Sequence, residues 1–142
     1  NVGRAIANTS TPAVGVFNGC FYTDPTTQKP TWKNYLPGST VASDIIAFVI
    51  DGPDTVFEIN ADDVFAVADI FKNFSISNET GNTKTGISNV QLDVSESGTA
   101  STFLVQAIDI SGDVLNSDVA VSNMNVLVRI NNHFYRSATS GL

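Results

Sequence analysis

The sequence is poor in cysteine, histidine and positive charge. Its 142 residues include one Cys, one His and 7 Lys+Arg against 14 Asp+Glu, which gives a formal net charge of −7. The few cations are scattered along the chain, so they form no basic stripe, and the acidic balance would repel a phosphate backbone. We therefore expect no nucleic-acid partner.

Long apolar runs and metal-ligand clusters are also absent from the sequence. No apolar run approaches the ~18 residues of a membrane-spanning helix, so we expect no membrane partner. Cys20 is the only cysteine, which excludes an intrachain disulfide and a Cys/His zinc cluster. Its apolar neighbours indicate a packed, unreactive thiol. We expect the protein to need no cofactor or metal.

Asn, Ser and Thr are abundant instead, at 14 residues each, while only 15% of residues are charged. This composition favours strands and tight turns. Short apolar blocks bounded by turn residues predict strands over residues 14–22, 45–50, 55–60, 74–77, 87–94, 102–110 and 125–131. In the last block, Val126, Val128 and Ile130 should share one buried face.

The predicted fold is all-β: an antiparallel β-barrel or β-sandwich with long loops and at most one short helix. The helix is expected near residues 63–71, where capping residues precede apolar residues at helical spacing. Residues 1–142 read as a single domain. Because Asn1 is not an initiator residue, we expect the native chain to have residues before it.

The links between these blocks carry turn signals. Asp51-Gly52-Pro53-Asp54 is a turn sequence and predicts a hairpin over residues 45–60. Residues 111–113 predict another turn, and residues 79–86 a loop. Residues 24–43 contain three prolines and Gly38, which indicates a long ordered loop or an arm rather than a core element.

No catalytic constellation is apparent, so we expect the protein not to be an enzyme. Such a site needs a nucleophile beside a base, a pair of carboxylates with separated pKa values, or a metal. The single histidine, His133, follows the last predicted strand with no nucleophile motif beside it. A structural or interface role is the simpler interpretation of His133.

Acidic residues suggest two cation sites, and both fall short on ligands. Asp109, Ser111 and Asp113 have the spacing that begins a calcium loop, but the sixth position is Val114 and the twelfth is Ala120. A second group of acids would gather around a cation only if the predicted hairpin brought its ends together, and surface acids in turns are the simpler interpretation. Its members are Asp51, Asp54, Asp62 and Asp63.

Three Asn-x-Ser/Thr triplets, at residues 8–10, 73–75 and 78–80, would accept glycans in a secreted eukaryotic protein. In a chain so rich in these residues, several such matches are expected by chance.

The most informative stretch runs from Tyr22 to Pro37, where aromatic residues alternate with prolines and lysines. Prolines reduce the entropy lost on ordering, and Trp and Tyr are strong interface anchors. We expect Trp32, Tyr35 and Leu36, together with Tyr22, to bind a partner. A loop folded back on its own domain explains the same pattern equally well.

Two segments resemble a known family. Residues 15–38 contain Gly15-Val16-Phe17-Asn18-Gly19-Cys20-Phe21-Tyr22 and Pro30-Thr31-Trp32-Lys33-Asn34-Tyr35-Leu36-Pro37, and residues 47–62 contain Asp51-Gly52-Pro53-Asp54. They resemble segments of the capsid decoration, or cement, proteins of tailed bacteriophages. Weaker similarity at residues 85–88, 92–93 and 126–133 extends the resemblance over most of the chain.

The resemblance implies a structural virion protein on the outer surface of the phage head, bound to the major capsid protein and in contact with copies of itself. The alternative is a receptor- or glycan-binding β-domain of a phage tail or cell-surface protein.

Overall fold

The computed structural model describes residues 11–78, 80–82 and 84–142. Within them the strands are β1 (Val16–Thr23), β2 (Pro30–Lys33), β3 (Ile46–Ile50), β4 (Val56–Asn60), β5 (Asn73–Ser77), β6 (Gln91–Gly98), β7 (Val105–Ile110) and β8 (Asn125–Ile130). The helical element among these residues is one 3-10 turn, η1 (Val67–Asp69). The all-β prediction with at most one short helix is confirmed.

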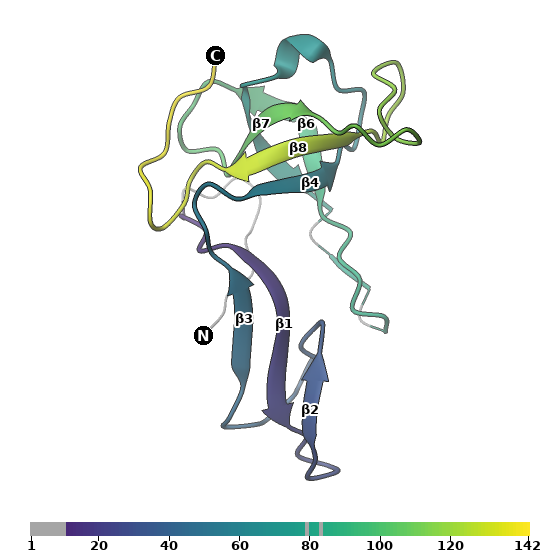
Figure 1. The fold of residues 1–142 in the computed structure, drawn as a ribbon, viewed down its shortest axis with the longest axis vertical. Helices are drawn as coiled ribbons and strands as arrows, with labels where there is room; N and C mark the ends of the chain where they lie inside the picture. The colour runs from purple at the N-terminus through teal and green to yellow at the C-terminus, as the bar shows by residue number, and fades with distance from the viewer. Residues whose placement is uncertain (1–10, 79, 83) are drawn as a thin grey trace.

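The strands form two antiparallel sheets. One has three strands in the order β2-β1-β3, and the other has five in the order β4-β8-β7-β5-β6. Figure 1 shows the three-stranded sheet projecting from one end of the five-stranded sheet. We call the three-stranded sheet and its connecting loops the arm, and the rest of the described chain the body.

The hydrophobic core lies in the body. Phe65, Phe74 and Leu92 are fully buried there, and Val126 and Val128 of β8 are at most 2% exposed. The predicted buried face of residues 125–131 is therefore confirmed, because a strand with one covered face buries every second side chain.

The five-stranded sheet curls until its edge strands approach each other without closing into a barrel. Beyond the end of β4, Asp62 N–H donates to the Leu92 carbonyl at 3.0 Å, and the Asp62 carboxylate accepts from Val94 N–H at 3.0 Å. These bonds attach one edge of the sheet to the other through a short segment rather than a strand pair.

The predicted hairpin over residues 45–60 is wrong. β3 pairs with β1 in the arm, whereas β4 pairs with β8 in the body. The turn itself is present, closed by a 3.1 Å hydrogen bond from Thr55 N–H to the Gly52 carbonyl. It contains Pro53, whose fixed negative φ is incompatible with the tight hairpin turns that need positive φ, so the turn directs the chain from arm to body.

The structure also bears on the predicted loop at residues 24–43, the predicted helix and the glycan triplets. Residues 24–43 are not loop throughout, because β2 lies within them and pairs with β1. The predicted helix is reduced to η1, since Ala66 before it and Ile70 after it both have extended backbone geometry. Asn73 is fully buried and offers no surface to a glycan, and the triplet at residues 8–10 lies outside the described residues.

Candidate functional site

Strand register gathers exposed apolar side chains on one face of the arm. Phe21 of β1 lies opposite both Trp32 of β2 and Ile46 of β3, and Val16 lies opposite Ile50. Directly opposed residues project to the same side of a sheet. We call this surface the arm face; its members are Val16, Phe21, Trp32, Ile46, Phe48 and Ile50.

A bulge in β1 sets the composition of the arm face. The register with β3 shifts between Phe17 and Gly19, which leaves Asn18 as an extra residue. The bulge changes the alternation, so Val16 and Phe21 project to the same side although they are five positions apart, an odd offset that would otherwise place them on opposite sides. Without it, one end of β1 would present its side chains to the opposite face.

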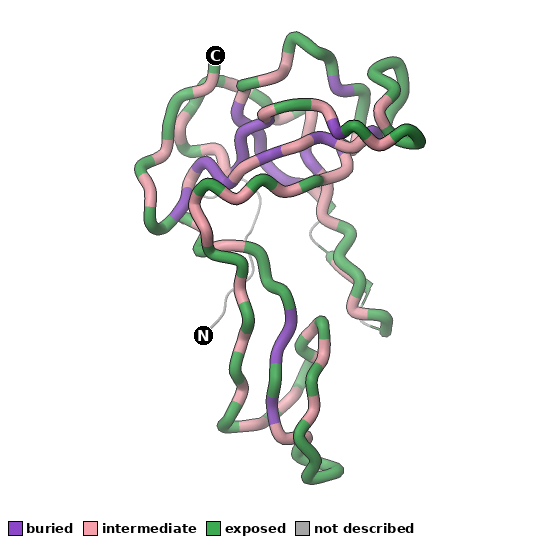
Figure 2. The backbone as a smooth tube through the Cα atoms, viewed as in Figure 1, coloured by how far each residue is buried: buried purple, intermediate pink, exposed green. Residues whose placement is uncertain are grey.

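The arm face is both exposed and uncharged. Its side chains have exposed fractions from 38% at Phe21 to 57% at Trp32 and Ile46. Figure 2 shows the contrast with the body, where buried stretches run through the sheet. Contiguous apolar surfaces of this kind are often functional, which makes the arm face the candidate site.

The opposite face of the arm is covered in part by its own chain, although Phe17 on that face is 36% exposed. Cys20 and Tyr22 are 0% and 2% exposed, and the Cys20 thiol donates to the Tyr35 carbonyl at 3.6 Å. Burial raises the pKa of the Cys20 thiol, which keeps it protonated and unreactive. The loop after β2 therefore packs back on the arm, as one of the two sequence interpretations of this stretch held.

Tyr35 also connects the arm to the chain between β5 and β6. A Cβ atom added at Gly86 would lie 2.1 Å from Tyr35 Cδ1, so only a residue without a side chain fits beneath the ring. Gly86 has a φ of +71°, a conformation that glycine adopts at low cost. Tyr35 thus packs the arm against the loop between β5 and β6.

The four residues expected to bind a partner are therefore divided by the structure. Trp32 lies on the arm face, and Leu36, in the loop after β2, is 46% exposed. Tyr22 and Tyr35 contribute to the internal packing of the arm, and Tyr22 has almost no surface to offer. The sequence analysis missed the other five residues of the arm face.

Hydrogen bonds to carboxylates fasten the far end of the arm. Asp44 accepts from Thr23 N–H at 3.0 Å, and hydrogen bonds from Thr23 lower the pKa of the Asp44 carboxyl. In the turn between β1 and β2, the Asp24 carboxylate accepts from Thr26 N–H at 2.8 Å and Thr27 N–H at 3.1 Å, which lowers the pKa of Asp24. The charged form of each carboxylate therefore supports the arm.

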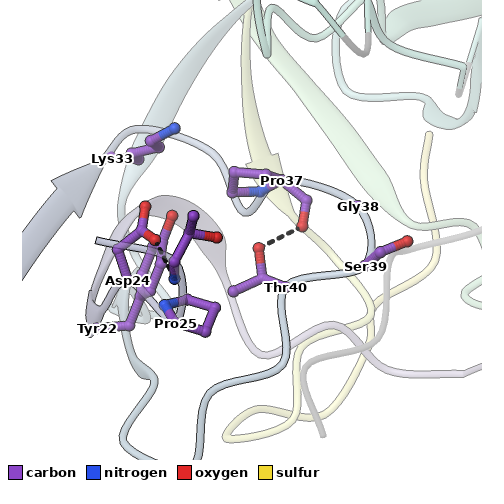
Figure 3. A pocket seen from close by; sticks show the side chains of 9 residues that line it. Tyr22, Asp24, Pro25, Lys33, Pro37, Gly38, Ser39 and Thr40 are labelled. Carbon is purple, nitrogen blue, oxygen red and sulfur yellow. Dashed lines mark hydrogen bonds between the residues drawn. The ribbon is translucent and has the colours of Figure 1, made fainter. Parts of the chain in front are cut away.

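A small hollow of about 210 Å³ lies near this end of the arm (Figure 3). It lies between the Asp24 turn and the loop that contains Pro37 and Thr40, where the Thr40 hydroxyl donates to the Pro37 carbonyl at 2.8 Å. Ligand pockets usually have about 300–1,000 Å³. The hollow is thus small for a substrate, and Asp24 is already engaged by its own turn.

Chemically reactive groups stay apart in the described part of the chain. His133 is 2% exposed, and its Nδ1 accepts from Tyr135 N–H at 3.0 Å. No group of three or more His, Cys, Asp or Glu side chains is placed there to hold a metal ion.

The acids considered as cation ligands serve other contacts. Asp113 accepts from Leu115 N–H at 3.1 Å within its turn, and Asp109 accepts from Ile110 N–H at 2.8 Å. Asp54 pairs with Arg136 at 3.0 Å, while Asp62 joins the sheet edges.

Among the residues that the structure places, no helix could span a membrane. Comparisons of the chain with protein-family models, curated proteins and solved structures find no match. Inferences about function therefore depend on the geometry of the arm and on the sequence resemblance.

Proposed function

We propose that this protein is a structural virion protein that binds the outside of a tailed-phage head, with the arm face as its docking surface. The single observation that carries the proposal is the exposed, uncharged apolar face of a projecting sheet whose other face is covered in part by its own chain. Its partner is the major capsid protein, and the proposed binding needs no cofactor.

The sequence resemblance and this surface coincide. Residues 15–38, the most specific part of the resemblance, include β1 and β2, and the second specific segment begins within β3. The two specific segments thus supply residues of all three arm strands, and the second continues through β4 of the body. This agreement favours the arm over the body as the docking element.

The proposed action is mechanical. DNA packed inside a head pushes neighbouring capsid subunits apart. A protein that binds the expanded shell across such subunits adds its binding free energy against their separation, because ligand binding stabilises the state that binds. Many copies act on one shell, so modest affinity for each copy is sufficient.

Co-sedimentation with empty phage capsids tests the proposal. The protein should sediment with expanded capsids and stay in solution with unexpanded ones. Phe48→Ser, which places a hydroxyl on the arm face, should abolish sedimentation. The matched control is Leu115→Ser, because Leu115 is 89% exposed but lies in the body, between β7 and β8. Absence of capsid binding by the unaltered protein would refute the proposal.

A second candidate function, glycan binding by a tail or cell-surface domain, is favoured by an exposed aromatic pair. Phe134 and Tyr135 are 64% and 60% exposed, with ring centroids 5.3 Å apart. Aromatic rings at a surface are suitable platforms for sugar rings. Binding on a glycan array that Tyr135→Ala abolishes and Phe48→Ser leaves intact would favour this alternative over capsid attachment.

A further inference from the structure

The arm face is a large exposed apolar patch on the free protein. At roughly 200 Å² for a whole aromatic side chain and roughly 120 Å² for an aliphatic one, its six residues expose about 450 Å² of apolar surface at their observed exposed fractions. The largest apolar patch on a typical soluble monomer is about 300–600 Å² and is often functional. The arm face is therefore large enough to bind a partner before the protein meets a capsid.

We propose that, away from the capsid, the arm faces of two copies of this chain pack against each other about a two-fold axis. Two sheets that bury apolar faces against each other form a sandwich with a spacing of ~10 Å. The second copy supplies the layer that the uncovered side of the arm lacks, while the covered side keeps its own loop.

The area of the surface fits a weak dimer. Two arm faces together bury about 900 Å² of apolar surface, and the polar rim adds to it, so the interface reaches the ~1,000 Å² at which specific association begins. Stable dimers bury more. The pair is therefore expected to form at high concentration and to dissociate readily.

The contact surface itself carries no charge, although the net charge of the chain does not favour pairing. Each copy carries a net charge of −7, which opposes association. None of the six arm-face residues is charged, so no like charges are brought into the contact itself. The arm projects from the body, which separates the body acids from the contact (Figure 1).

The dimer would compete with the capsid for the same surface. That exchange depends on the proposed function, whereas the pairing of two copies does not. On an expanded shell, many fixed partners would replace a single weak partner. Free protein would thus be held in a form that cannot aggregate through its arm but remains ready to bind.

Sedimentation equilibrium of the full chain, from about 1 µM to about 1 mM, tests the pairing. The average mass should rise from 15.1 kDa towards twice that value. Phe48→Ser should raise the dissociation constant of the dimer at least about tenfold. Leu115→Ser, the control in the body, should dimerise like the unaltered protein.

Fluorescence of Trp32 gives a second measurement that needs no variant. Trp32 is the only tryptophan and is 57% exposed, so its emission should shift to shorter wavelength as the dimer forms. A constant mass of 15.1 kDa at all concentrations, a trimer, or a dimer without the shift would overturn the inference. A protein that stays monomeric but sediments with expanded capsids would leave the proposed function standing, and a dimer that ignores capsids would refute only that function.

Discussion

Replacing Trp32 with alanine removes the largest side chain of the arm face. Trp32 is 57% exposed, so docking would bury about 140 Å² of a side chain of roughly 250 Å². At about 25 cal/mol per Å², this surface contributes at most about 3.5 kcal/mol to binding, or a factor of about 300 in affinity. Association costs consume part of this contribution, so we expect Trp32→Ala to weaken capsid binding between about tenfold and about 300-fold.

The covered part of the Trp32 ring packs on the arm itself. A Cβ atom at Gly19 would lie 2.6 Å from Trp32 Cζ2, which shows how closely the ring covers the β1 backbone. Trp32→Ala therefore also loosens the arm, and Trp32→Phe serves as a milder variant that keeps an aromatic ring there. Thermal unfolding followed by circular dichroism identifies the temperature range in which each variant stays folded.

The assay is a titration of expanded empty capsids with the labelled protein at a temperature where all variants are folded. Affinity should decrease from the unaltered protein to Trp32→Phe and further to Trp32→Ala, while Leu115→Ala, a truncation in the body, should bind normally. If folded Trp32→Ala bound within twofold of the unaltered protein, the arm face would not be the docking surface.

Four further outcomes are expected. Below about pH 3.8 the arm should loosen, because the folded-state pKa values of Asp24 and Asp44 lie under the ordinary value of 3.8, so their stabilisation is present above that pH and is lost as pH falls through the lowered pKa values. Asp44→Asn should reduce this response in Trp32 fluorescence, and an unchanged response would exclude Asp44 as a cause. Gly86→Ala should lower the free energy of unfolding by at least ~1–2 kcal/mol, since a left-handed φ disfavours alanine and its methyl group would overlap Tyr35, and denaturant unfolding at the unaltered midpoint would contradict this. A chelator should leave the melting temperature unchanged, whereas a loss that calcium restores would reveal a cation site. Capsid occupancy should stay constant or rise as the salt concentration increases, because salt screens the repulsion between acidic copies while apolar contacts persist; the screening length is roughly 8 Å at about 0.15 M. A steady decline in occupancy would indicate binding through opposite charges.

Sequence pattern was sufficient for most of the body strands, although β6 spans Gln91–Gly98 where the pattern predicted residues 87–94. Val126 and Val128 alternate with residues that are less buried, and a strand with one covered face produces this period of two. The turn at Gly52 and Pro53 was also visible, but the choice of partner strands was not. Strand pairing depends on contacts between distant segments, which local alternation does not encode.

The arm face was hidden for two physical reasons. β3 is apolar at every position, so nothing in Ile46, Phe48 and Ile50 distinguishes the exposed side from the covered one. The bulge at Asn18 then changes the alternation of β1, which no spacing rule anticipates. The fit of Tyr35 over Gly86 was not visible in the sequence either, because it depends on a loop far away in the chain.

A cryo-electron microscopy map of mature tailed-phage particles mixed with this protein tests the central claim most directly. The account predicts density for the chain on the outer surface of the head, with Phe21, Trp32 and Phe48 against the major capsid protein at a junction between subunits. Density for the chain on the tail alone, or on a head with the arm face turned to solvent, would contradict it.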